Sequence, residues 1–129
     1  MKTREEIELL AKQLVDCLLA VHRTMGPGLL ESANQACLVH ELRSRGLTVQ
    51  CEVVLPVRYA GIEIEAGYRI DMLLEDCIIV ENKAVQAIVP IYEAQLLNYL
   101  KLSDRKLGFL VNWNVSLIKD GIKRMVNGL

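Results

Sequence analysis

The stretch from residue 67 to 85, GYRIDMLLEDCIIVENKAV, constrains the fold more than any other part of the chain. It places one acid, Asp71, before a short β-rich apolar run that ends in Glu81-Asn82-Lys83. Alternate side chains of a strand share a face, so Glu81 and Lys83 lie on one side with Cα atoms roughly 6.6 Å apart. Charged groups at the end of a buried strand are unfavourable unless they are paired or bind a metal ion.

The connection between the two strands of this stretch decides whether the acids cooperate. A three-residue loop at 75–77 places Asp71 opposite Glu81, with Cβ atoms roughly 5 Å apart. A two-residue turn needs a bulge to restore that register, because a slip of one residue puts the acids on opposite faces. Two such carboxylates repel unless a proton or a cation lies between them, and Mg²⁺ or Mn²⁺ suits hard oxygen ligands. The alternative interpretation is a surface hairpin with an ordinary Glu–Lys pair.

Three helices are expected, over residues 4–23, 29–45 and 91–102. Thr3 and Glu6 predict a capping box at the start of the first helix. Gly46 is expected to end the second helix in a left-handed backbone conformation.

Two of these helices carry candidate site residues. Glu31 lies within about 20° of Leu38 and Leu42 on the second helix, which puts its carboxylate on the core-facing stripe. The alternative is an acid placed favourably at the positive end of the helix dipole. Gln95 and Tyr99 share a face of the third helix one turn apart, where Gln95 could also simply bond to backbone beside a half-buried tyrosine.

The remaining elements read as strands. Residues 48–59 and 62–70 alternate, with Pro56 marking either an edge strand or a bulge and with Ile62, Ile64 and Tyr68 facing inward. After Asp71 both faces become apolar, which indicates a sheet covered on both sides. Residues 107–111 form a buried strand, and Asp120-Gly121 predicts a hairpin between 116–118 and 122–126. Strands joined through a crossover helix imply a mixed sheet with helices on both faces.

Composition limits the classes of function. At 129 residues, with 52% hydrophobic and 24% charged, the chain is expected to be one soluble domain over residues 1–129. No apolar run approaches the ~18 residues of a membrane span and no signal peptide is evident, so we expect a cytoplasmic protein with no membrane association. A net charge of −1 and an isoelectric point near 6.1 argue against bulk electrostatic attraction to nucleic acid.

Three motifs in order resemble those of a known superfamily. Asp71, followed ten positions later by Glu81-x-Lys83, resembles the signature of the PD-(D/E)xK nucleases. Gly28-Leu-Leu-Glu31 resembles the start of the motif that names the GxxExxY family. Residues 95–99, QLLNY, resemble the QxxxY motif of RecB-like exonucleases, and the similarity runs from about residue 14 to 126. One departure is that Asn34 stands where the GxxExxY family has tyrosine.

The resemblance implies a restriction-endonuclease-like α/β sandwich, with a mixed central sheet flanked by helices. It also implies metal-dependent hydrolysis of phosphodiester bonds in nucleic acid, with DNA as the expected substrate. Asp71 and Glu81 are the implied ligands of Mg²⁺ or Mn²⁺, together with the backbone carbonyl of Asn82. Glu31 is the implied ligand of a second ion or of its waters.

The other implied roles concern the substrate. Lys83 would orient the attacking water and stabilise charge on the phosphate, Gln95 would maintain the attacking geometry, and Tyr99 would pack there or contact the phosphate. A second hypothesis is a non-catalytic module that keeps the nuclease fold and binds nucleic acid, a protein partner or a second copy. The acidic isoelectric point and Asn34 favour it. A third is an interaction protein whose hairpin is incidental.

Overall fold

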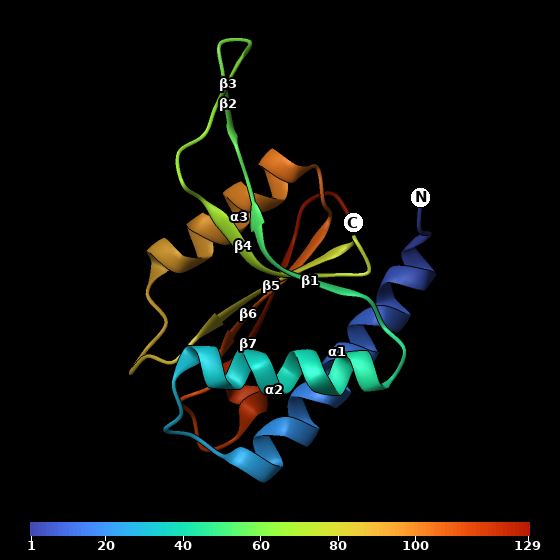
Figure 1. Cartoon of the computed structure of the whole chain (residues 1–129), viewed down its shortest axis with the longest axis vertical. Helices are drawn as coiled ribbons and strands as arrows, with labels where there is room; N and C mark the ends of the chain where they lie inside the picture. The colour runs from blue at the N-terminus through green and yellow to red at the C-terminus, as the bar shows by residue number, and fades with distance from the viewer.

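The computed structural model describes residues 1–129 as three layers, with a five-stranded sheet between helices (Figure 1). In spatial order the strands are β1 (Val49–Val54), β4 (Arg69–Leu74), β5 (Ile78–Lys83), β6 (Leu107–Asn112) and β7 (Ile122–Val126). The helices are α1 (Arg4–Met25), α2 (Glu31–Ser44) and α3 (Pro90–Ser103). Strands β5 and β6 are parallel and are joined by α3, whereas every other neighbouring pair is antiparallel. The predicted mixed α/β sandwich is therefore confirmed.

Two apolar cores lie on opposite faces of the sheet. The core under α1 and α2 includes Leu14, Leu38, Met72, Val80 and Trp113. The core under α3 includes Ile70, Leu73, Ile79, Leu96 and Leu110. Every residue of β6 is buried. The sheet is thus covered on both sides, as the apolar runs predicted.

The helix ends follow local signals in the sequence. Thr3 Oγ1 accepts a hydrogen bond from the Glu6 amide at 3.1 Å, and the Glu6 carboxylate accepts one from the Thr3 amide at 2.9 Å. This is the predicted capping box. Gly46 adopts a φ of +81° just after α2, as expected of a left-handed helix end. No helix is both long enough and apolar enough to cross a bilayer.

Strand β1 changes the faces that its side chains occupy. Val49 packs in the core under α1 and α2, whereas Val53 and Leu55 pack under α3, although simple alternation places all three on one face. The reversal coincides with Glu52, whose φ is +52° within the strand. The predicted single apolar face of residues 48–59 is therefore wrong, while the predicted edge position is confirmed because β1 ends the sheet.

Strands β2 (Val57–Tyr59) and β3 (Ile62–Ile64) form a separate two-stranded ribbon that projects from the body (Figure 1). The prediction that residues 62–70 face inward is wrong for most of this segment, since Ile62 is 59% and Tyr68 42% exposed. Alternation identifies residues that share a face, but here no second layer covers that face.

The predicted hairpin around Asp120-Gly121 is also wrong. Ile118–Gly121 forms a short 3₁₀ helix, η1, and β7 pairs with β6 instead. A Cβ at Gly121 would collide with the carbonyl oxygen of Asn112. The glycine is needed for this close approach of two backbone segments, not for a hairpin turn.

Candidate active site

Strands β4 and β5 separate just where the acids stand. Their pairing runs from Leu74–Ile78 to Met72–Val80, which leaves the predicted three-residue loop at 75–77. Beyond the last pair β4 continues beside β1 and β5 beside β6, so the two strands diverge (Figure 1). Asp71 and Glu81 are the next residues on the two strands and lie opposite each other, in the register that the three-residue loop predicted.

Each acid bonds to the backbone of the opposite strand. The Asp71 amide donates to Glu81 Oε2 at 2.7 Å, and the Asn82 amide donates to Asp71 Oδ2 at 2.9 Å. The carboxylates therefore accept hydrogen bonds from two backbone amides that no longer pair with the opposite strand, because the strands diverge. Asp71 Oδ1 and Glu81 Oε1 make no hydrogen bond. We call this arrangement of Asp71, Glu81 and the Asn82 backbone the fork.

The electrostatics of the fork favour a proton or a cation. Glu81 is only 5% exposed, and burial followed by repulsion from Asp71 raises the pKa of Glu81 to about 8. Burial also raises the pKa of Asp71, against the hydrogen bond from the Asn82 amide, which lowers it. Two partly desolvated carboxylates with a free oxygen each are a favourable place for positive charge.

Lys83 is a cation whose charge acts on both acids of the fork. Its charge lowers the pKa of Asp71 and of Glu81, although this effect is weaker than burial. The ammonium makes no ion pair with either carboxylate and lies 4.7 Å from the centroid of the Tyr92 ring. Because Lys83 follows Glu81 by two positions on β5, both side chains emerge on the face covered by α3.

Gln95 and Tyr99 of α3 lie over the sheet face that carries Glu81 and Lys83. Gln95 Nε2 donates to the Tyr99 hydroxyl at 2.9 Å, so the phenol is oriented by its neighbour one turn earlier. Burial, and then the charge of Glu81, raise the pKa of Tyr99. The predicted alternative, in which Gln95 bonds to backbone, is wrong. The phenol retains its own proton to donate elsewhere.

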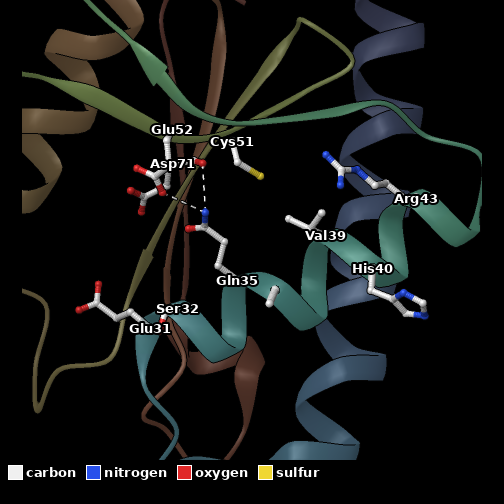
Figure 2. Close-up of a pocket in the computed structure, with 10 residues that line it drawn as sticks. Glu31, Ser32, Gln35, Val39, His40, Arg43, Cys51, Glu52 and Asp71 are labelled. Carbon is white, nitrogen blue, oxygen red and sulfur yellow. Dashed lines mark hydrogen bonds between the residues drawn. The ribbon is translucent and has the colours of Figure 1, made fainter.

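The opposite face of the fork is held by a chain of hydrogen bonds that sequence reasoning missed. Trp113 Nε1 donates to Asn82 Oδ1 at 2.9 Å, and Asn82 Nδ2 donates to Gln35 Oε1 at 3.2 Å. Gln35 Nε2 then reaches the Asp71 carbonyl oxygen at 3.3 Å and Glu52 Oε1 at 3.1 Å (Figure 2). This chain ties α2 and the segment after β6 to three strands. The one sequence feature that could have indicated Gln35 is its position one helical turn after Glu31.

Glu52 is a third acid near the fork, and it was not predicted. It stands opposite Asp71 in the register of β1 and β4, and its charge raises the pKa of both Asp71 and Glu81. Its left-handed φ turns its side chain to a pocket of about 630 Å³ shared with Asp71 and the first turns of α2 (Figure 2). No sequence signal marks a left-handed glutamate within a strand.

Glu31 and Asn34 make no hydrogen bond to the fork, although the charge of Glu31 raises the pKa of Asp71. Glu31 is the first residue of α2, is exposed and makes no hydrogen bond, so the expectation that its carboxylate is withdrawn from solvent on the core-facing stripe is wrong. That its carboxylate points toward Asp71 and Glu81 stays a prediction. Glu31 lines the rim of the pocket that contains Asp71 and extends away from Gln35 (Figure 2). Asn34 is buried and donates to the Leu29 carbonyl at 3.4 Å, while its Oδ1 has no partner.

The donor set of the fork fits a hard divalent cation. The structure has no group of three or more His, Cys, Asp and Glu side chains arranged to hold a metal ion. Mg²⁺ needs no such cage, because it is commonly held by one or two carboxylates with waters and substrate phosphates completing the shell. The free oxygens of Asp71 and Glu81 meet that requirement.

The mixed sheet, its flanking helices and the acids at the strand fork define a restriction-endonuclease-like fold. A family model described as the PD-(D/E)XK nuclease superfamily matches residues 8–125. The chain therefore belongs to the PD-(D/E)XK nuclease superfamily, whose nucleases generally use divalent metals and act on nucleic acid. Neither a search of curated proteins nor a search of solved structures found a match.

Proposed function

We propose that this protein is a nuclease of the GxxExxY family that hydrolyses phosphodiester bonds of nucleic acid, with DNA as the expected substrate and Mg²⁺ or Mn²⁺ as cofactor. The observation that carries the proposal is the fork. The buried carboxylate of Glu81 and the half-buried carboxylate of Asp71 each keep one free oxygen there, and Lys83 follows Glu81 by two residues on the same strand. Two facing acids whose pKa values are raised by burial and by mutual repulsion are typical of functional sites.

Asp71 and Glu81 would hold the ion through Oδ1 and Oε1. When bound, such an ion supplies Lewis-acid charge beside a phosphodiester and lowers the pKa of a nearby water. Both acids must be ionised to act as ligands, so the proton favoured at Glu81 by burial leaves when the cation enters. Glu31, at the pocket rim, would contact a second ion or its waters.

Lys83, Gln95 and Tyr99 would act on the substrate. The water oxygen bonds to phosphorus as one P–O ester bond breaks, and the proton released by the water balances the one taken up by the departing oxygen. Lys83 would orient the water and stabilise the charge that develops on the phosphate. Gln95 orients the Tyr99 hydroxyl, whose free proton can reach a phosphate oxygen.

The non-catalytic module is the second candidate function. Two observations favour it: the net charge of −1 and the exposed position of Glu31, which makes no hydrogen bond to the fork. In this hypothesis the fold binds nucleic acid or a partner chain without turnover.

Cleavage of a mixed panel of single- and double-stranded DNA and RNA, with Mg²⁺ or Mn²⁺, separates the two candidates. We expect wild-type protein to cleave at least one substrate, and Lys83→Met to reduce the rate by about 10²–10³ because it removes a charge that acts on the phosphate. Glu81→Gln should reduce cleavage by weakening metal binding. Equal inactivity of the wild type and both variants across the panel would support the binding module instead.

A further inference from the structure

An apolar pocket of about 610 Å³ lies beside the fork, between α3 and the base of the β2–β3 ribbon. Seven of its ten lining residues are hydrophobic, and three of these are the tyrosines Tyr68, Tyr92 and Tyr99. Tyr68 meets Tyr99 edge to face, with ring centroids 6.0 Å apart, and remains 42% exposed. A pocket of this size with partly exposed aromatic rings is suited to a flat, aromatic ligand.

The pocket is continuous with the proposed phosphate site. Gln95 and Tyr99 belong to both, and Tyr92 lines the pocket while its ring lies under the Lys83 ammonium. A phosphate held near Lys83 is therefore separated from the pocket by little more than the Tyr92 ring. On this basis we propose that the pocket binds an unpaired nucleobase of the strand whose phosphate lies at the fork. The inference rests on the proposed function and narrows its substrate to nucleic acid with unpaired nucleotides.

The charge of the molecule supports this assignment. Binding of an intact duplex is driven largely by phosphate contacts to basic residues, and this chain has a net charge of −1. Near the pocket, Lys83 and Lys101 carry no carboxylate partner, whereas Lys123 is paired with Glu93 at 2.8 Å. Stacking of bases on aromatic side chains supplies affinity that does not depend on a basic surface. The bases of a duplex are already stacked and paired, so only an unpaired or extruded base can enter.

Binding of short labelled strands tests the proposal without relying on turnover. Fluorescence anisotropy would measure the affinity for single-stranded DNA, single-stranded RNA and the matched duplex, with Ca²⁺ in place of Mg²⁺ or Mn²⁺. A gel would check that the strands remain intact. We expect both single strands to bind at least tenfold more tightly than the duplex. If Lys83 and Lys101 are the two phosphate contacts, the salt dependence should be shallow, with a slope of log K against log salt of about −1.4.

Variants at Tyr68 isolate the pocket. Tyr68→Ala should weaken single-strand binding about five- to tenfold, since a stacked base contributes on the order of 1 kcal/mol or more. Tyr68→Trp should restore binding, and unchanged thermal unfolding would show that Tyr68→Ala remains folded. Tyr59→Ala is the matched control, because Tyr59 is 70% exposed on the ribbon and lies outside the pocket. In a series of strands that each carry one abasic position, only the strand whose missing base would occupy the pocket should bind more weakly. Tyr68→Ala should bind all strands of this series equally.

Four results would overturn the proposal: no binding of any strand, equal binding of duplex and single strands, a flat abasic scan, or equal effects of Tyr68→Ala and Tyr59→Ala. These results are distinct from failure of the proposed function. Cleavage within a duplex without a preference for unpaired nucleotides would refute the base pocket and leave the nuclease. Base-dependent binding without metal-dependent cleavage would refute the nuclease and leave the base pocket.

Discussion

At the scale of single residues, the electrostatic state of Glu81 controls what the fork can do. Buried and facing Asp71, Glu81 has its pKa raised from about 4.5 to about 8. A carboxyl group whose pKa is higher in the folded state binds its proton more tightly when folded. Its contribution therefore stabilises the fold at low pH and is lost as the pH rises from about 4.5 to about 8.

We expect the free energy of unfolding of the metal-free protein to fall between about pH 5 and 8, by an amount on the order of 4 kcal/mol from Glu81 alone. The raised pKa of Asp71 acts in the same direction. Urea unfolding curves at several pH values measure the effect. Glu81→Gln should flatten the slope, and Mg²⁺ should stabilise the wild type more at pH 8 than at pH 5. A slope unchanged by Glu81→Gln would show that Glu81 is not the group that titrates.

At the residue scale, the spacing of residues along the chain predicted part of the site geometry. The three-residue loop at 75–77 fixed the register that puts Asp71 opposite Glu81, and helical spacing brought Gln95 to Tyr99. Residue spacing did not indicate Gln35 and Glu52. Their roles depend on packing between α2 and the sheet and on one left-handed backbone angle, and neither follows from periodicity.

At the scale of elements, the chain of hydrogen bonds through Gln35 joins α2 to the fork. We expect Gln35→Leu to lower the free energy of unfolding by about 1–3 kcal/mol, because Asn82 and the Asp71 carbonyl each lose a partner in a half-buried site. Thermal or urea unfolding measures this loss. Gln50→Leu is the matched control, since Gln50 is exposed on β1. Equal stability of Gln35→Leu and Gln50→Leu would mean that the chain does not support the fork.

The elements themselves were largely predictable, with instructive exceptions. Both faces of β4 and β5 read as apolar, which predicted a sheet covered on both sides. The ribbon of β2 and β3 alternates as well, yet Ile62 is exposed, because alternation does not reveal whether a second layer is present. Gly121 likewise resembled a turn glycine and instead allows close contact with Asn112.

At the scale of the whole molecule, the ribbon and the sheet should differ in local stability. An isolated two-stranded ribbon is marginally stable in water, whereas β5 and β6 lie between two cores. We expect amide hydrogens of residues 57–64 to exchange far faster than those of β5 and β6, at any protein concentration. Hydrogen-exchange mass spectrometry measures this difference. Protection of the ribbon that rises with protein concentration would contradict the expectation and indicate that a second copy covers it.

The most direct test of the nuclease interpretation is calorimetric titration of the protein with Mg²⁺ and Mn²⁺. We expect a saturable divalent site in the wild type, loss of binding in Asp71→Ala and weaker binding in Glu81→Gln. Lys83→Met should bind the ion equally or slightly more tightly, because that variant removes a neighbouring positive charge. Glu63→Gln, on the exposed ribbon, is the control and should bind as the wild type does. Binding that is undetectable at millimolar ion, or that survives Asp71→Ala unchanged, would contradict a metal site at the fork.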